Sequence, residues 1–275
     1  MSENIQSQRV VLDIKNLCKN FGGRATADGY EGGLWAVRDF GITVHEGQLA
    51  GLIGPNGAGK TTVFNMISAL LSVTSGDIAF HGKSLVGMAP HAITQLGIGR
   101  TFQNIRIFPR LSVLDNVRIA LHTHAGYGLA SAVWHGNDFA VKERELTEKA
   151  QDFLAVFELQ DKQDEIASNL PYGEQRRVEM ARALAAQPKL LLLDEPAAGM
   201  NPAEVRSLMD RIRFVRDRFK LTILLIEHQM RVVMGICEWI TVMDFGEVIC
   251  RGDPDHVCDD PKVIEAYLGK AGGRV

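Results

Sequence analysis

A glycine-rich segment near residue 55 constrains the fold of this chain more than any other feature. It follows the apolar run 49–53, precedes a predicted helix at about 60–71, and reads Gly54-Pro55-Asn56-Gly57-Ala58-Gly59-Lys60-Thr61. This matches GxxxxGK[ST] in the strand-then-helix context that makes the motif a phosphate-binding loop, and that agreement disfavours a fortuitous glycine-rich turn. Glycines let the backbone approach an anion, and the helix that follows adds its positive N-terminal end.

The loop supplies phosphate contacts and a metal ligand. Lys60 is expected to reach the β and γ phosphates, and the Thr61 hydroxyl to bind Mg²⁺. Thr62 adds a further phosphate contact. The expected cofactors are therefore ATP and Mg²⁺. The residues expected to bind ATP here are Gly54, Pro55, Asn56, Gly57, Ala58, Gly59, Lys60, Thr61 and Thr62.

Two further polar groups follow apolar runs. The run Leu190–Leu193 ends in Asp194 and Glu195, and the run Leu221–Ile226 is followed closely by His228. Asp194 is placed to hold the Mg²⁺ shell, usually through water, and Glu195 to polarise an attacking water as general base. The alternatives are a helix cap or solvated turn for the acids and a structural role for the histidine. Carboxyl ends of parallel strands gather at one sheet edge, so we expect these groups to converge with the loop and His228 to contact the γ-phosphate.

Alternation of apolar runs with helical patterns predicts an α/β fold with a mostly parallel sheet. Strands are expected at 10–14, 40–44, 49–53, 189–193 and 221–226, helices at 60–71, 174–186 and 203–219, and a hairpin at 239–251 with its turn at Asp244–Glu247. The early strands form a separate β region. Residues 111–169 read as a helical insertion. We expect one domain over 1–275, with a helical subdomain at about 105–170 and a C-terminal extension at about 247–275. Residues 24–34 read as a surface insertion without an assigned function.

Composition excludes several classes of protein. The chain has 275 residues, with 30 Lys+Arg against 33 Asp+Glu and a net charge of −3, so it has no electrostatic footprint for nucleic acid. Its four cysteines show no CxxC spacing and are too few for a disulfide framework, which favours a reducing compartment. No apolar run approaches the roughly 18–20 residues that cross a bilayer, and the N-terminus does not read as a signal peptide. Work at a membrane would require a partner.

The ordered set of motifs resembles the ATP-binding subunits of ABC transporters over essentially the whole chain. Arg100-Thr101-Phe102-Gln103 is similar to the family's Q-loop, Asn169–Arg177 to its signature, Ala198–Asn201 to its D-loop, and His228 to its switch histidine. The resemblance implies a P-loop NTPase with a RecA-like core, an antiparallel β region and an inserted α-helical subdomain. LPYGEQRR, DEPAAGMNP and RTFQNIRIF, and the C-terminal PKVIEAYLG, resemble one branch of the family, the LivG-type ATPases of branched-chain amino acid importers.

Several residue roles follow from the resemblance alone. Gln103 would sense Mg²⁺ and the attacking water. Phe21 would stack on adenine; the alternative for Phe21 is simple packing at a strand end. In the head-to-tail dimer of the family, Tyr172, Gly173 and Glu174 would face the ATP of the partner subunit. The sequence departs from the common LSGGQ at Pro171, Tyr172 and Glu174, and has Asn201 where many relatives carry Asp. Because an acid near phosphate is unfavourable, we expect the Glu174 carboxylate to turn aside or its role to be indirect.

The resemblance also implies partners. These are two membrane permease subunits, a second ATPase subunit that is either a copy or a paralogue, and indirectly an extracytoplasmic substrate-binding protein. The location would be peripheral, on the cytoplasmic face of the inner membrane. The apolar segment Ile105–Pro109 is a candidate docking site for a permease helix. The alternative is that this segment packs inside the subdomain. Alternative cargoes are urea or amides, aromatic acids, or exported lipopolysaccharide. A soluble ATPase acting on ribosomes or DNA is disfavoured because the chain has one cassette and no charged linker or coiled coil.

Overall fold

The larger of the two main sheets forms the centre of the molecule. The structure is a computed structural model that describes residues 9–26, 29–122 and 137–268. In the larger sheet the strand order is β12-β11-β5-β10-β9-β8, and every neighbouring pair is parallel except β11 and β12. Its strands are β5 (Leu49–Ile53), β8 (Ile98–Arg100), β9 (Leu190–Asp194), β10 (Thr222–Ile226), β11 (Trp239–Asp244) and β12 (Glu247–Gly252). The predicted parallel sheet and the 239–251 hairpin are confirmed.

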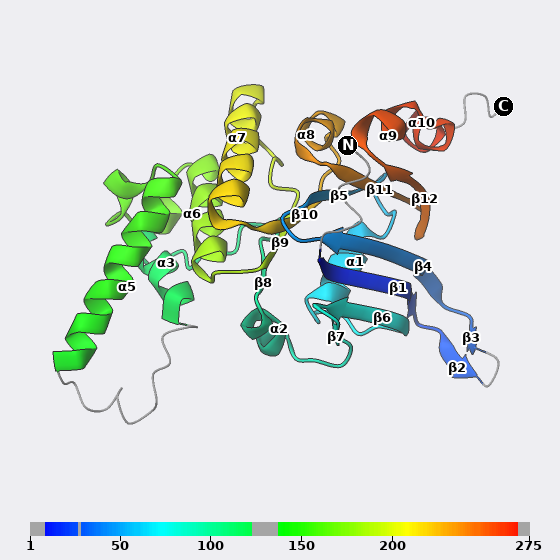
Figure 1. Ribbon diagram of the computed structural model, residues 1–275, viewed down its shortest axis with the longest axis horizontal. Helices are drawn as coiled ribbons and strands as arrows, with labels where there is room; N and C mark the ends of the chain where they lie inside the picture. The colour runs from blue at the N-terminus through cyan, green and yellow to red at the C-terminus, as the bar shows by residue number, and fades with distance from the viewer. Residues whose placement is uncertain (1–8, 27–28, 123–136, 269–275) are drawn as a thin grey trace.

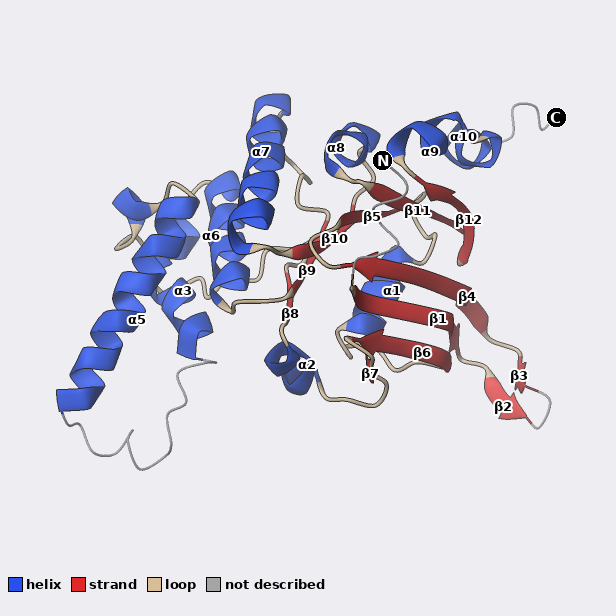
Figure 2. Ribbon diagram, viewed as in Figure 1, coloured by secondary structure: helices blue, strands red, loops and turns tan. Residues whose placement is uncertain are grey.

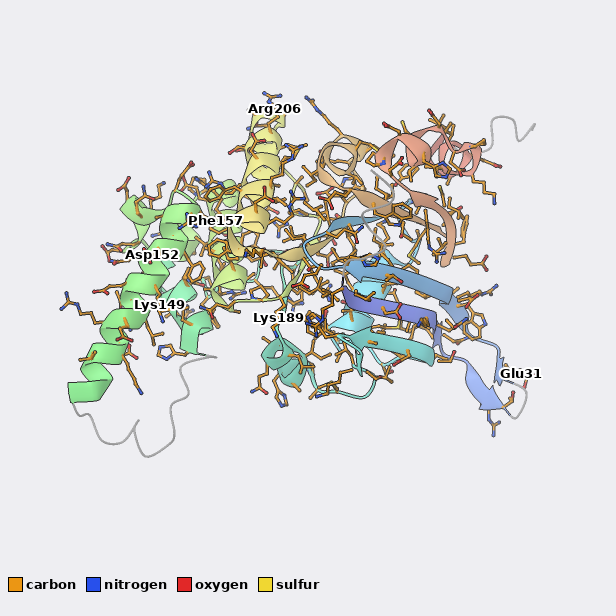
Figure 3. The ribbon with its side chains drawn as sticks, viewed as in Figure 1. Glu31, Lys149, Asp152, Phe157, Lys189 and Arg206 are labelled. Atoms are coloured by element: carbon orange, nitrogen blue, oxygen red, sulfur yellow. The ribbon has the colours of Figure 1, made fainter. Side chains whose placement is uncertain are left out.

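A second, antiparallel sheet lies beside the first (Figure 1). Its strands, in the order β4-β1-β6-β7, are β1 (Val10–Phe21), β4 (Leu34–His45), β6 (Ser75–Phe80) and β7 (Lys83–Ser84). Within the 24–34 insertion, β2 (Arg24–Thr26) pairs with β3 (Gly29–Glu31), and residues 27–28 lie outside the described residues. Figure 3 places Glu31 of this hairpin at one end of the molecule and Lys149 and Asp152 at the other.

The helices of the described residues are α1 (Lys60–Ile67), α2 (Pro90–Leu96), α3 (Val113–Leu121), α5 (Asn137–Val156), α6 (Tyr172–Ala185), α7 (Pro202–Phe219), α8 (Met230–Ile236), α9 (Pro254–Asp259) and α10 (Pro261–Leu268), with 3₁₀ turns η2 (Gln160–Lys162) and η3 (Ala167–Asn169). Some helices cover the sheets, and α3, α5 and α6 form a group to one side of them (Figure 2). Helices α3 and α5 pack on α6 and occupy the predicted subdomain, of which residues 123–136 are not described. None of the helices in the described ranges has the length and apolarity that crossing a bilayer requires.

Two hydrophobic cores explain why the strands of the larger sheet are apolar throughout. Leu191 and Leu193 of β9 belong to the core shared with the inserted helices, whereas Leu190 and Leu192 belong to the core shared with α1 and the antiparallel sheet. Successive side chains of a strand point to opposite faces, so a sheet covered on both sides has no position for an exposed residue. Helix α1 is thereby held between the two sheets, directly after the phosphate-binding loop.

The structure differs from the predicted elements in several places. The first helix ends at Ile67 rather than at residue 71, because Ala69 adopts a left-handed φ of 53° and the N–H groups of Leu70 and Leu71 both bond the carbonyl of Asn65. The expected strands 10–14 and 40–44 are longer, as β1 and β4. Strand β8 was not predicted, since a strand of three residues shows no periodicity.

Candidate nucleotide site

The phosphate-binding loop requires glycine at two positions where its backbone runs against neighbouring chain. Gly54 has a φ of 149°, and a Cβ there would lie 2.0 Å from the carbonyl oxygen of Met243. Gly59 has a φ of 102°, and a Cβ would lie 2.5 Å from the carbonyl oxygen of Ala36. Gly59 is also the N-cap residue of α1. Because glycine has no side chain to bond the first N–H groups of the helix, these groups stay available for an anion.

Lys60 is buried inside the loop, with 5% of its surface exposed. Its Nζ donates hydrogen bonds to the carbonyl oxygens of Gly54 at 2.7 Å and Pro55 at 2.9 Å. Burial lowers the pKa of Lys60, and the nearby charges of Glu195 and Asp194 act in the opposite direction. The ammonium group is therefore held in position by backbone oxygens that phosphate oxygens can replace.

Three predicted residues from separate parts of the chain meet beside the loop. Gln103 Nε2 donates a hydrogen bond of 2.9 Å to Glu195 Oε2, and His228 Nδ1 lies 3.6 Å from the same oxygen. Glu195 adopts a left-handed φ of 46° directly after β9, and its N–H bonds the carbonyl of Ile226 at 2.9 Å. This bond ties the end of β9 to the end of β10, which brings the carboxylate and the imidazole together.

A hollow of about 480 Å³ joins these groups to the loop. It is lined by Ala36, Asn56, Gly57, Ala58, Gly59, Lys60, Thr61, Thr62, Gln103, Glu195 and His228. The volume lies in the usual range for small-molecule sites. The sequence-based expectation that the strand ends converge on the loop agrees with this arrangement.

Asp194, the residue before Glu195, is buried and does not itself line the hollow, and it is held by an arginine for which no motif had indicated this role. Arg100 Nη2 donates to Asp194 Oδ2 at 2.8 Å, and Nη1 donates to Asn65 of α1 and to Ser68 directly after it, both at 2.9 Å. The side chains of the ion pair are 7% and 3% exposed. Burial lowers the pKa of Arg100, although the hydrogen bond to Asp194 opposes this. The pair joins β8, β9 and α1.

The residues of this site fit a magnesium ion. Asp194 Oδ1 is buried and, within the described residues, has no hydrogen-bond partner. An unpaired buried carboxylate oxygen is costly unless a cation or water satisfies it. Thr61 and Gln103 line the hollow together with Glu195, which directly follows Asp194, so hydroxyl, amide and carboxylate oxygens, which Mg²⁺ prefers, are all available.

Sequence comparison identifies the family to which this site belongs. Residues 37–198, more than half of the chain, match the ABC transporter family. The chain belongs to the ABC transporter family of ATPases. Residues 247–272 of this ABC cassette match a second family, described as the branched-chain amino acid ATP-binding cassette transporter. The predicted family and P-loop NTPase fold are thereby confirmed.

Individual relatives agree with this result. The cassette is 38% identical to the high-affinity branched-chain amino acid transport ATP-binding protein BraF of Pseudomonas aeruginosa, over 96% of this chain and 99% of the relative. It is 40% identical to LivG of Escherichia coli K12, over 87% and 94%. The lipopolysaccharide export protein LptB of the same organism is 35% identical, over 94% and 97%. The crystal structure of the ADP conformation of MJ1267, an ATP-binding cassette of an ABC transporter, superposes with a TM-score of 0.79 at 29% identity, covering 95% of this chain and 99% of that one.

The signature residues of the cassette lie apart from the hollow described above. Pro171, Gly173 and Glu174 line a different hollow, together with residues of α7. Tyr172 is 47% exposed at the start of α6. The Glu174 carboxylate forms ion pairs with Lys162 at 2.6 Å and Arg177 at 3.5 Å. It thus points toward its own subdomain.

Arg176 connects the signature helix to Gln103 and Glu195, a contact that no sequence motif had predicted. Its guanidinium is fully buried, pairs with Glu179 at 2.7 Å and donates to the carbonyl oxygens of Gln103 at 3.0 Å and Glu195 at 3.2 Å. Glu179 in turn accepts the N–H groups of Phe102 and Arg106. The only sequence signal for this ion pair was an arginine and a glutamate three residues apart inside a predicted helix.

Two other motif residues also have defined positions. Phe21 ends β1 opposite Leu34, is 42% exposed and has Lys19 Nζ 5.2 Å from its ring centroid. It does not line the hollow beside the phosphate-binding loop, so adenine stacking stays a prediction. Asn201 caps α7 by accepting the N–H groups of Ala203 and Glu204, a role that aspartate fills equally well.

Proposed function

We propose that this cassette binds and hydrolyses ATP to drive an importer of branched-chain amino acids. The observation that carries the proposal is the meeting of the phosphate-binding loop, Gln103, Glu195 and His228 around one hollow. A loop alone would indicate nucleotide binding, whereas a carboxylate positioned by two polar neighbours beside it supplies the group that hydrolysis needs.

The mechanism follows from these contacts. Lys60 exchanges the carbonyls of Gly54 and Pro55 for phosphate oxygens, and the N–H groups at the start of α1 bind the remaining charge. Glu195 accepts a proton from water as the water attacks the γ-phosphate. Gln103 and His228 hold that water and the carboxylate in position. Bound Mg²⁺, held by Thr61, Asp194 and Gln103, would neutralise the charge that develops on the phosphates.

A second ATPase subunit, either a copy or a paralogue, would complete the site in a head-to-tail dimer. The start of α6 is separate from the hollow of its own chain and exposes Tyr172. A helix N-terminus attracts anions, so Tyr172 and Gly173 would face the γ-phosphate bound by the partner. The ion pairs of Glu174 with Lys162 and Arg177 reduce the cost of an acid at this position and support an indirect role.

The assignment of branched-chain amino acids as cargo rests on the C-terminal match at residues 247–272 and on the BraF and LivG relatives. The LptB relative makes lipopolysaccharide export the alternative. Uptake of labelled leucine, isoleucine, valine, phenylalanine and urea by source cells carrying Glu195→Gln would decide between cargoes. We expect loss of leucine, isoleucine and valine uptake alone. Normal uptake of these three with failure of another solute would refute the cargo but not the ATPase.

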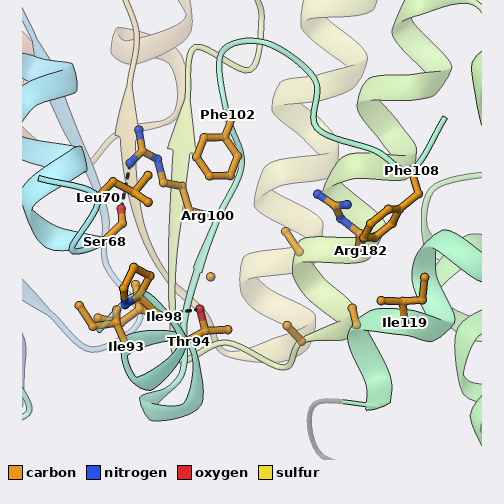
Figure 4. Close-up of a pocket in the computed structure, with 15 residues that line it drawn as sticks. Ser68, Leu70, Ile93, Thr94, Ile98, Arg100, Phe102, Phe108, Ile119 and Arg182 are labelled. Carbon is orange, nitrogen blue, oxygen red and sulfur yellow. Dashed lines mark hydrogen bonds between the residues drawn. The ribbon is translucent and has the colours of Figure 1, made fainter. Parts of the chain in front are cut away.

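The permease subunits would dock on a second hollow of about 350 Å³, at the cytoplasmic face of the inner membrane. Figure 4 shows it between Phe102 and Arg100 on one side and Phe108 and Arg182 on the other. Its apolar rim includes Leu70, Phe108 and Ile119, which are 47%, 44% and 41% exposed. Exposed apolar side chains around a groove, with arginines beside them, suit a short amphipathic helix. Of the predicted 105–109 dock, Phe108 lines this hollow.

Co-purification with the co-expressed permeases tests this dock. Phe108→Asp is expected to abolish it because a charge would replace an aromatic contact. Phe214→Asp is a matched control, since Phe214 on α7 is 49% exposed and, like Phe108, lies beside an arginine. Equal recovery of both variants would refute the assignment of this surface.

A further inference from the structure

Three residues with metal-binding side chains lie together beside β12, the edge strand of the larger sheet. Cys250 is on β12, His256 is in α9, and Asp260 directly precedes α10. One ligand atom from each, a thiol sulfur, an imidazole nitrogen and a carboxylate oxygen, lies within 4.8 Å of the other two. The ATPase chemistry described above uses none of them.

The fold positions each of these side chains by a specific contact. Cys250 and Gly252 are two residues apart on β12, so they share a face of the strand. The ring of His256 packs directly on Gly252, where a Cβ would lie 2.5 Å from its Cδ2. Asp260 accepts the N–H groups of Lys262 at 2.8 Å and Val263 at 3.4 Å, which fixes its carboxylate at the start of α10.

The donor set is the one that zinc prefers. Zn²⁺ takes thiolate, imidazole and carboxylate ligands in tetrahedral geometry, and sites with three protein ligands keep a water in the fourth position. Zn–S and Zn–N bonds of about 2.3 and 2.0 Å place tetrahedral ligands about 3.5 Å apart. His256 is exposed, so rotation of its ring can close the remaining separation, because the cluster already lies within 4.8 Å.

Metal binding at Cys250 requires its thiol to lose a proton. Burial, followed by the hydrogen bond to Asp260, raises the pKa of Cys250 to about 11. A bound divalent cation reverses this preference because it stabilises the thiolate. Coordination therefore forms the metal–sulfur bond and releases one proton to solvent, without any change of oxidation state.

We propose that Cys250, His256 and Asp260 form a binding site for a thiophilic divalent metal ion of the Zn²⁺ type. Bound there, the ion joins β12, α9 and the start of α10. Lys262, Glu265 and Ala266 of α10 line one hollow with Pro55 and other residues of the phosphate-binding loop. The metal thus braces the element that lies next to the loop.

Titration of the full-length chain with Co²⁺ tests the site, because a cobalt–thiolate bond absorbs strongly in the near ultraviolet while Zn²⁺ is colourless. We expect this band at one equivalent of Co²⁺, and its loss when Zn²⁺ displaces the cobalt. Cys250→Ser and His256→Gln are expected to weaken binding more than about ten-fold, since loss of an outer-shell partner alone costs that much.

Cys258→Ser is the matched control. Cys258 is an exposed cysteine in the same helix as His256 and is outside the cluster, so the band is expected to persist unchanged in this variant. Because His256 is exposed, His256→Gln tests the site without disturbing the core, and thermal melting of each variant verifies folding. Absence of the band in the wild-type chain would overturn the proposal. So would a band that survives Cys250→Ser or His256→Gln and disappears in Cys258→Ser.

Discussion

Replacement of Arg176 by methionine is expected to lower both the stability of the cassette and its rate of ATP hydrolysis. The side chains of Arg176 and Glu179 are 0% and 1% exposed, and their charged groups lie 2.7 Å apart. Removing one partner of a buried pair leaves an uncompensated charge and costs about 3–5 kcal/mol. Glu179 keeps the N–H groups of Phe102 and Arg106, so we expect the lower end, about 3 kcal/mol.

The effect on catalysis has a separate cause. The Arg176 guanidinium donates to the backbone oxygens of both Gln103 and Glu195, whose side chains are hydrogen-bonded to each other beside the phosphate-binding loop. Loss of these two donors loosens the carboxylate relative to the nucleotide. Displacements on the order of 1 Å cost about 100-fold in rate, so a fall in kcat of roughly 10- to 100-fold is expected.

Urea unfolding, monitored by tryptophan fluorescence, measures the change in stability. Steady-state phosphate release measures the change in kcat. Arg144→Met is the matched control: Arg144 is 82% exposed and pairs with Glu148, which is 61% exposed, so its loss is expected to cost about 1 kcal/mol or less. Adding Glu179→Gln to Arg176→Met should recover part of the stability because no charge stays buried. A loss below about 1 kcal/mol for Arg176→Met, with unchanged kcat, would refute the reasoning.

Three other variants test the phosphate-binding loop and Glu227, the buried residue directly before His228. Lys60→Ala removes charge-assisted hydrogen bonds to phosphate and should weaken ATP binding about 10- to 100-fold by calorimetry. Gly59→Ala places a Cβ 2.5 Å from the carbonyl oxygen of Ala36 at a φ of 102°, so it should lower both the melting temperature and nucleotide affinity; wild-type values for both would contradict the loop geometry. Burial raises the pKa of Glu227 above its ordinary 4.5, so the stability from this group is present below pH 4.5 and is lost as the pH rises through the raised value. Glu227→Gln should flatten the dependence of melting temperature on pH in that window, and an unchanged slope would count against it.

Local sequence patterns were sufficient for the parts of this protein that follow from backbone chemistry. The glycines of the phosphate-binding loop, the strand that ends in Asp194 and Glu195, and the position of His228 after a second strand all predicted one site. That inference needed only the rule that carboxyl ends of parallel strands meet at one edge. The fold class follows from the same alternation of buried strands and helices. Roles assigned by resemblance alone, such as that of Phe21, stay predictions.

The tertiary structure decided which side chains hold that site in place. Arg100 meets Asp194 across 94 positions of sequence, and Arg176 reaches the backbone of Gln103 across 73. The grouping of Cys250, His256 and Asp260 depends likewise on the packing of α9 and α10 against β12. Periodicity records only whether a residue faces a core, and it carries no information about which distant residue shares that core. Such pairs exist only once the chain has folded, because packing rather than spacing brings their atoms together.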